Sequence, residues 1–133
     1  MTQLMAVYGT LKRGFGNNCL IEAAEMPFLS EAVTKDSKFS LEGGGFPIAR
    51  DGGNQQVAVE LFTFEDEPQI KGIDNLEGHP TWYVRRLVPV VLEDGTEAEA
   101  WMYIQGPFED ETYYDVMSED GITVTEEGVA SWA

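Results

Sequence analysis

Residues 57–64 alternate so regularly between apolar and other side chains that they specify a β-strand with two different faces. Val57, Val59 and Leu61 are predicted on one face, and Glu60, Phe62 and Phe64 on the other. The chain is therefore expected to be organised around a β-sheet.

Four further segments have the composition of strands. Residues 4–8 form a short apolar run that ends at Gly9, and residues 33–41 lead into the glycine cluster at 43–45. Residues 82–92 and 98–104 are rich in β-branched and aromatic side chains, and the turn residues 93–96 predict that they pair as a hairpin. Pro89 indicates an edge strand or a bulge, because proline cannot donate a ladder hydrogen bond.

Two short helices are expected between these strands. The first begins at an N-cap on Asn17 or Asn18, shows helical spacing in Leu20, Ala23 and Ala24, and is closed by Pro27. The second follows the acidic, proline-bearing opening at residues 66–68 and extends to about residue 77. Together these elements predict one α+β domain over residues 1–133, a small, mostly antiparallel β-barrel with two short helices.

Charge and composition exclude several classes of partner. The 133 residues include 24 acidic and 8 basic side chains, and the formal net charge is -16. Such a surface repels phosphate backbones and anionic lipids, so neither nucleic acid nor a membrane is an expected partner, although solubility is the simpler explanation of the charge. Cys19 and His79 each occur once, which excludes an intrachain disulfide and a His or Cys metal cage. No long apolar segment or secretion signal is evident, so we expect a cytoplasmic location.

Glu77 is the one carboxylate that falls within an apolar helical stripe. At about 100° per residue, Ile70, Ile73 and Leu76 mark this stripe on the second helix, and Glu77 follows Ile70 by seven residues. Burial of the Glu77 carboxyl would favour its neutral form and raise its pKa, as a general base that works near neutrality requires. The alternative is that the helix ends at Leu76 and leaves Glu77 in a solvated loop.

Four motifs, in this order along the chain, resemble those of the γ-glutamylcyclotransferase family. They are Tyr8-Gly9-Thr10-Leu11-Lys12-Arg13-Gly14; Gly44-Gly45-Phe46-Pro47; Leu76-Glu77-Gly78-His79-Pro80 followed by Tyr83 and Arg85; and Ala100-Trp101-Met102-Tyr103. Each motif is weak alone, whereas their order and spacing are specific. The resemblance covers about residues 5–104 and leaves an acidic C-terminal extension at 105–133.

The resemblance implies a barrel cavity in which the backbone N–H groups of Tyr8, Gly9, Thr10 and Leu11 hold a γ-glutamyl group, with Tyr83 in the cavity wall. It also implies that Glu77 is the catalytic acid and base. The reaction would be intramolecular: the α-amino nitrogen attacks the γ-carbonyl, closes 5-oxoproline and releases an amine. No metal or organic cofactor is required, and the expected partner is a small γ-glutamyl substrate whose leaving group the sequence does not specify.

Simpler explanations exist for most of these residues. Gly9 and Thr10 could serve only the turn, Tyr8 and Tyr83 could be packing aromatics, and Cys19 fits a small residue on a helix face. Lys12 and Arg13 could attract an anionic substrate, but solvated surface cations are commoner. His79 fits an exposed loop residue.

Two other functions are compatible with the sequence. The same barrel could bind a small metabolite without turnover, although an intact Glu77 and turn at residues 8–11 favour an enzyme. The acidic segment could instead recruit a cationic partner, with the barrel as support. Tyr113, Tyr114 and Trp132 in this segment predict that it docks on the body of the protein.

Overall fold

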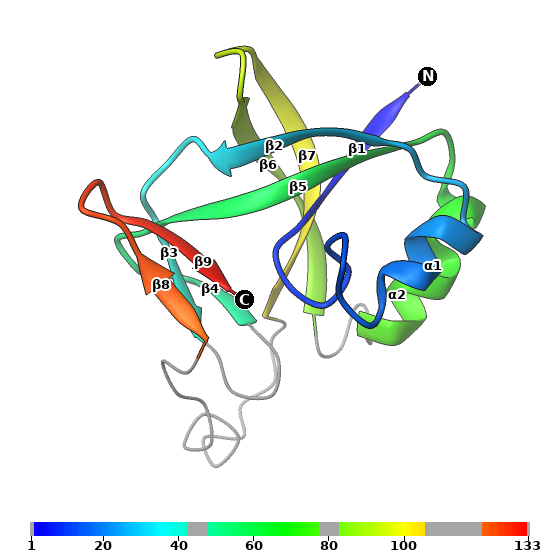
Figure 1. Cartoon of the computed structure of the whole chain (residues 1–133), viewed down its shortest axis with the longest axis horizontal. Coiled ribbons are helices and arrows are strands. Elements are labelled where there is room, and N and C mark those ends of the chain that lie inside the picture. Colours follow the sequence, from blue (N-terminus) through cyan, green and yellow to red (C-terminus); the bar gives the residue numbers. More distant parts are fainter. Residues whose placement is uncertain (1, 43–47, 78–82, 106–120, 133) are drawn as a thin grey trace.

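The computed structural model describes residues 2–42, 48–77, 83–105 and 121–132, without the side chains of Glu42, Glu77, Tyr83 and Gln105. It contains nine strands, two α-helices and one 3-10 helix within these ranges (Figure 1). The strands are β1 Gln3–Val7, β2 Phe28–Thr34, β3 Phe39–Glu42, β4 Ile48–Asp51, β5 Gln56–Phe64, β6 Tyr83–Leu92, β7 Glu97–Gln105, β8 Ile122–Val124 and β9 Val129–Trp132. The helices are α1 Asn18–Ala23, η1 Glu67–Ile70 and α2 Lys71–Glu77.

Five strands close into a barrel, as predicted. The main sheet has the order β1-β7-β6-β2-β5-β9-β8, and an additional β1–β5 pairing joins the ring. β1 pairs antiparallel with β5 from Gln3↔Phe64 to Val7↔Glu60, and parallel with β7 at Met5↔Trp101 and Ala6↔Met102. Closure removes the free edges that a five-stranded open sheet would present.

β5 separates two hydrophobic cores, because its side chains alternate between the inside and the outside of the barrel. Val57, Val59 and Leu61 lie in the interior core, which also receives side chains from the β3–β4 hairpin. Phe62 and Phe64 lie in a second core on the outer face, under the helices, with Ile21 of α1 and Ile70 and Ile73 at η1 and α2. Burial of each such aliphatic or aromatic side chain stabilises the fold by about 1.5–3 kcal/mol. The predicted two-faced strand is confirmed.

The prediction of one strand over residues 33–41 is wrong. β2 ends at Thr34 and β3 begins at Phe39, and the polar residues 35–38 between them are exposed. Phe39 exchanges backbone hydrogen bonds with Gln55, at 3.0 and 2.8 Å, which directs its fully buried side chain into the barrel. The local sequence of residues 33–41 does not show that one strand ends and another begins there, because the start of β3 depends on pairing with the distant Gln55.

Pro89 lies neither on an edge strand nor at a bulge. β6 runs between β7 and β2, and its register with β7 is continuous through Pro89↔Glu99. The ladder between β2 and β6 ends at Thr34↔Val90, and the Pro89 carbonyl accepts from the Lys35 N–H at 2.9 Å. The N and O atoms of one strand residue face the same neighbour, so the proline nitrogen also faces Lys35, just beyond the end of β2, and its missing N–H removes only the reciprocal bond of this terminal pair.

The predicted helices and hairpin are present. α1 begins after Asn17, and residues 93–96 connect β6 to β7, with Gly95 at a φ of 86°. The second helix begins as the 3-10 turn η1, capped by the Asp66 side chain, and continues as α2. Within the described residues, no helix is long and apolar enough to cross a membrane.

The last described segment docks on the barrel, as the aromatic residue Trp132 predicted. β9 pairs parallel with β5 at Gln56↔Val129 and Val57↔Ala130, and the Ala130 side chain is fully buried in the interior core. Tyr113 and Tyr114 lie outside the described residues.

Candidate functional site

The turn that follows β1 contains a group of backbone donors that find no acceptor in the described part of the chain. Its carbonyls are bonded: Gly9 O accepts from the Lys12 N–H and Thr10 O from the Asn17 N–H, both at 3.0 Å. The Asn18 side chain donates to Leu11 O at 2.8 Å. The N–H groups of Gly9, Thr10 and Leu11, in contrast, reach no acceptor among the residues that the structure describes. We call these three residues the donor turn. Gly9 and Thr10 are half-buried and Leu11 is buried, and clustered backbone donors of this kind are suited to a carboxylate or an oxyanion.

Asn17 holds the donor turn from the other side. It occupies the N-cap position of α1, but its side chain makes no capping hydrogen bond and instead donates to the Thr10 hydroxyl at 2.8 Å. The Thr10 side chain is therefore part of the local structure, which agrees with the simpler explanation that it supports the turn.

Tyr8 anchors the turn in the interior of the protein. Its side chain is buried, and its hydroxyl accepts from the Ala49 N–H at 3.2 Å and donates to the Tyr103 carbonyl at 2.6 Å. The hydroxyl thus joins β4 to β7 directly beneath the donor turn. This is the packing role considered for Tyr8 from the sequence, and a contact between Tyr8 and substrate stays a prediction.

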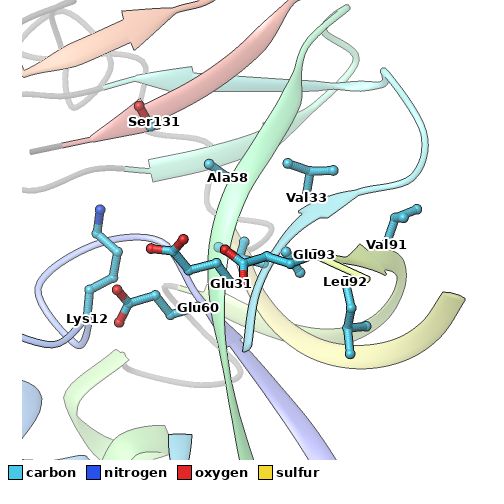
Figure 2. A pocket seen from close by; sticks show the side chains of 11 residues that line it. Lys12, Glu31, Val33, Ala58, Glu60, Val91, Leu92, Glu93 and Ser131 are labelled. Carbon is cyan, nitrogen blue, oxygen red and sulfur yellow. The ribbon is translucent and has the colours of Figure 1, made fainter. Parts of the chain in front are cut away.

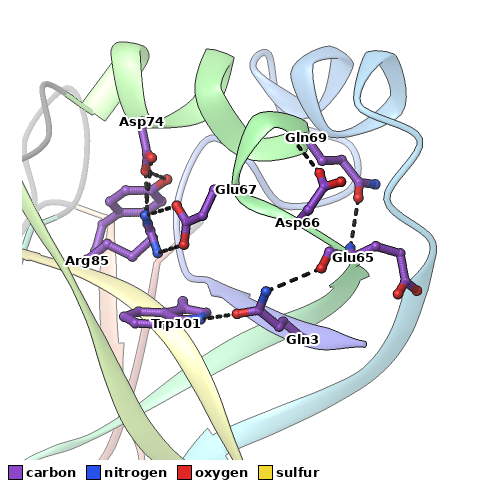
Figure 3. A network of polar contacts seen from close by, with 9 residues as sticks. Gln3, Glu65, Asp66, Glu67, Gln69, Asp74, Arg85 and Trp101 are labelled. Carbon is purple, nitrogen blue, oxygen red and sulfur yellow. Dashed lines mark hydrogen bonds and ion pairs between the residues drawn. The ribbon is translucent and has the colours of Figure 1, made fainter. Parts of the chain in front are cut away.

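Tyr103 of β7 continues this connection to α2. The Tyr103 hydroxyl donates to Asp74 Oδ1 at 2.5 Å, and Arg85 Nε donates to the same oxygen at 3.0 Å (Figure 3). Asp74 precedes Glu77 by three residues, less than one helical turn. A chain of hydrogen bonds therefore runs from the donor turn's anchor, Tyr8, through Tyr103 to the helix that carries Glu77.

Arg85 is the charged centre of this network. Its side chain is only 7% exposed, and it also binds the Glu67 carboxylate, at 2.7 Å from Nη2 to Oε2. Its guanidinium lies 4.7 Å from the centre of the Trp101 ring, whose indole N–H donates to Gln3 at 2.9 Å. Burial lowers the pKa of Arg85, but the hydrogen bonds and charges of Asp74 and Glu67 outweigh it and raise that pKa. Arg85 consequently stays charged and ties η1 and α2 to β6.

The predicted apolar stripe on the second helix is only partly present. Ile70 and Ile73 are buried, whereas Leu76 is 46% exposed, so its assignment to the stripe is wrong. Position 77 follows Ile73 by four residues, whereas Leu76 follows it by three. Viewed along the helix axis, these two positions therefore lie on opposite sides of Ile73. α2 includes Glu77, which excludes the alternative that the helix ends at Leu76.

Several predicted site residues lie partly or wholly outside the described part of the chain. The backbones of Glu77 and Tyr83 are described, as the last residue of α2 and the first of β6, but their side chains are not. The burial of the Glu77 carboxyl and the place of the Tyr83 ring in the cavity wall stay predictions. His79 and the motif at residues 44–47 fall outside the described residues.

A groove of about 440 Å³ lies on the outer face of β2 and β5, next to the loop that follows the donor turn (Figure 2). Lys12, Glu31, Glu60, Glu93 and Ser131 supply its polar lining. A hydrogen bond with Glu31 raises the pKa of Glu93, and burial lowers the pKa of Lys12. Arg13 already pairs with Glu60, at 3.4 Å, and with Glu31, at 3.9 Å. None of the predicted catalytic or substrate-binding residues is in this lining.

No group of three His, Cys, Asp or Glu side chains that could hold a metal ion occurs in the described ranges. A model of the family described as "Gamma-glutamyl cyclotransferase, AIG2-like" matches residues 5–121. The chain belongs to this family. The match continues beyond residue 104, where the sequence motifs end, to the start of β8.

Relatives of the chain agree with membership of the gamma-glutamyl cyclotransferase family. A protein of Methanocaldococcus jannaschii, named "Putative gamma-glutamylcyclotransferase", is 34% identical over 98 residues, which cover 73% of this chain and 79% of that protein. A Drosophila melanogaster protein of the same name is 30% identical over 118 residues, which cover 83% of this chain and 74% of its own length.

Solved structures show the same fold. An AIG2-like protein of Mus musculus superposes with a TM-score of 0.70 at 23% identity, and the alignment covers 85% of this chain and 83% of that one. A protein specific to uropathogenic E. coli superposes with a TM-score of 0.63 at 24% identity, covering 86% and 84% of the two chains.

Sequence reasoning missed Asp74, Glu67 and the double role of Tyr103. Tyr103 and Arg85 do occur in the family motifs, and Asp74 stands one helical turn before Glu77, but no local pattern links these positions. Tyr8 and Tyr103 are 95 residues apart, so only the register of β1 against β7 brings them together.

Proposed function

We propose that this member of the gamma-glutamyl cyclotransferase family converts γ-glutamyl amines or γ-glutamyl amino acids to 5-oxoproline and the free amine. The observation that carries the proposal is the connection of the donor turn, through Tyr8 and Tyr103, to the helix that ends at Glu77. It links the two halves that an intramolecular acyl transfer needs, an oxyanion site and an acid–base residue.

Binding of the γ-glutamyl group would use the donor turn. The N–H groups of Gly9, Thr10 and Leu11 lack protein acceptors within the described ranges, and a substrate carboxylate or carbonyl oxygen would supply them. Tyr83, at the start of β6, would contribute to the wall of the cavity.

Glu77 would act first as the base and then as the acid. It takes a proton from the substrate α-ammonium, and the freed nitrogen attacks the γ-carbonyl carbon to form the five-membered ring. The oxyanion of the tetrahedral intermediate accepts hydrogen bonds from Gly9 and Thr10. Protonated Glu77 then gives its proton to the departing nitrogen as the old amide bond breaks. The ring nitrogen, which still carries two hydrogens, gives up one of them to the released amine, so the products are the neutral lactam and an ammonium, the carboxylate is regenerated and no cofactor is consumed.

Position 77 suits this role because it follows buried Ile73 by four residues and shares that side of α2. Desolvation there would raise the pKa of a carboxyl group, whereas a bound ammonium would lower it. The carboxylate would therefore be the stronger base in the free site, and transfer of the proton would neutralise the ammonium and restore the raised pKa that keeps the proton on Glu77 until the leaving nitrogen takes it.

The test is a panel of γ-glutamyl amines, γ-glutamyl amino acids and glutathione, with 5-oxoproline followed by mass spectrometry. We expect release by the wild type on at least one substrate. Glu77→Gln should lose nearly all activity, roughly 10²- to 10⁴-fold, because the amide can neither accept nor return the proton. Glu22→Gln, on the exposed face of α1, is the matched control and should keep wild-type turnover.

Two outcomes would contradict the proposal. Equal turnover by the wild type and Glu77→Gln would remove Glu77 from the mechanism. Absence of 5-oxoproline with every substrate, together with saturable binding of one of them by calorimetry, would identify the barrel as a binding module instead.

A further inference from the structure

The hairpin formed by β8 and β9 lies beyond the family match, which ends at residue 121, yet it is built into the barrel. Gly128 O accepts from the Gln56 N–H at 2.9 Å, and Ala130 is fully buried in the interior core. Figure 1 shows β9, in red, running beside β5 toward the loop that follows β1. The hairpin therefore has a defined position next to that loop.

Trp132 of β9 contacts the loop directly. Its carbonyl oxygen accepts from Lys12 Nζ at 2.6 Å, and its ring centre lies 5.1 Å from that of Phe15, at an interplanar angle of 42°. The Lys12 ammonium is itself 5.2 Å from the centre of the Phe15 ring. Two side chains of the loop are thus held by one residue of β9.

These contacts add to the other anchors of the loop. The Arg13 N–H donates to Glu60 Oε1 at 2.8 Å, and the Arg13 guanidinium lies 3.5 Å from the centre of the Phe28 ring. Residues 9–17, which we call the site loop, begin with the donor turn and contain three glycines, of which Gly14 has a φ of 86°. Glycines enlarge the set of conformations open to the chain, so an ordered loop needs contacts with other elements. Asn17 and Asn18 supply bonds at its α1 end, and Trp132 supplies contacts at its middle.

The state of Lys12 agrees with a positioning role. Burial lowers its pKa, against the opposing charges of Glu60 and Glu31, so its ammonium is partly withdrawn from water. A desolvated ammonium needs hydrogen-bond acceptors, and the Trp132 carbonyl is one. Lys12 directly follows the donor turn, so this hydrogen bond couples the position of β9 to the turn.

We propose that Trp132 is a positioning residue of the site, which acts through Lys12 and Phe15 to hold the site loop and hence the donor turn in its binding conformation. The inference rests on the proposed function for its effect on catalysis, but the ordering of the loop does not. Trp132 is expected to govern substrate binding and not proton transfer, because it contacts the loop and not α2.

The first measurement is independent of activity. Amide hydrogen exchange over residues 9–17 is compared in the wild type, Trp132→Leu and the control Val124→Ala, whose side chain is 47% exposed on β8 of the same hairpin. The amides of Lys12, Phe15 and Asn17 have backbone acceptors inside the loop and should exchange about 3- to 10-fold faster in Trp132→Leu, the effect expected from losing one aromatic pair. The control should match the wild type. Unchanged exchange in Trp132→Leu would overturn the proposal, whether or not the wild type shows activity.

The second measurement uses the substrate that the wild type turns over best. Trp132→Leu should lower kcat/KM by roughly 3- to 10-fold, because the donor turn both binds the γ-glutamyl group and stabilises the oxyanion, and should leave the pH dependence of kcat unchanged. Phe15→Leu should have a similar effect, and the double variant should be no worse than either single one, because both remove the same contact. An unchanged kcat/KM, a shifted pH profile or additive effects of the two substitutions would contradict positioning through this pair. Absence of turnover by the wild type would instead count against the proposed function, and the exchange result would still decide the role of Trp132.

Discussion

The Tyr8 hydroxyl should contribute more to stability than any other single atom of the connection between the donor turn and α2. Tyr8→Phe removes this oxygen and keeps the ring, so the packing of the interior core is conserved. The substitution takes the acceptor from the Ala49 N–H, at 3.2 Å, and the donor from the Tyr103 carbonyl, at 2.6 Å. Ala49 is fully buried and Tyr103 is 3% exposed, so water cannot readily replace the lost partner.

The expected destabilisation follows from these two groups. A buried polar group that loses its partner costs about 1–3 kcal/mol. A carbonyl has a second lone pair and suffers less than an N–H, so we expect a total of about 2–4 kcal/mol. For 133 residues the entropy of unfolding is about 0.28 kcal/mol per degree, which converts this loss to a decrease in Tm of roughly 7–14 °C.

Thermal unfolding followed by circular dichroism checks the prediction, with Tyr103→Phe as the matched control. The Tyr103 hydroxyl donates to Asp74, which is 17% exposed and keeps its ion pair with Arg85, so its removal should lower Tm by only about 2–5 °C. If Tyr8→Phe melts within 2 °C of the wild type, on the order of experimental error, or no lower than Tyr103→Phe, the hydroxyl does not hold β4 to β7 and the reasoning fails.

Three further predictions concern other contacts. Gly53→Ala should destabilise the fold by at least about 2–3 kcal/mol in urea unfolding, because the added Cβ would collide with the Phe39 backbone. In the control Gly95→Ala the Cβ meets open space, so only the roughly 1–2 kcal/mol cost of the positive φ is expected. Equal losses of stability in the two variants would contradict this reasoning. Hydrogen bonds from Arg86, at 2.7 and 2.6 Å, lower the pKa of Asp51 below its unfolded value of about 3.9, so their stabilisation is complete above that pH and is lost as the pH falls through the folded-state pKa. The Tm difference between wild type and Arg86→Gln should therefore be present at about pH 6 and shrink as the pH falls below about 3.9, and a constant difference would exclude this pair as its source. Asp74→Asn removes one of the two carboxylates that Arg85 binds in this network and keeps the other, Glu67. The substitution should lower Tm by roughly 4–10 °C and should also lower the kcat for 5-oxoproline release. Wild-type values of both Tm and kcat would show that the network does not position α2.

Local patterns were sufficient for most elements of the fold. The alternation of residues 57–64, the turn at residues 93–96 and the capped opening at Asp66 each specify their structure through neighbours in the chain, and all three are present. Errors occurred where a distant partner decides the outcome. Phe39 pairs with Gln55, Pro89 is tolerated because β2 ends beside it, and Leu76 is exposed because the buried side of the helix is set by the packing of Ile70 and Ile73.

For the candidate site, the family motifs located the donor turn and Glu77, and the structure added what connects them. Asp74, Arg85, Glu67 and Tyr103 stand on four different elements, and their spacing along the chain carries no periodic signal. Trp132 was expected to dock, but its contacts with Lys12 and Phe15 follow only from the parallel pairing of β9 with β5.

The amino-acid order alone therefore indicates most of the barrel strands, the two helices, the barrel class and a set of candidate site residues, because these depend on side-chain periodicity and on motifs only a few residues long. Closure of the barrel by β1 against both β5 and β7 is decided in three dimensions, and with it the meeting of Tyr8 with Tyr103 and of Lys12 with Trp132. These pairs are 95 and 120 residues apart in the chain. Contacts over such separations form only when the whole sheet adopts one register, since a shift by a single residue would turn every one of these side chains to the opposite face.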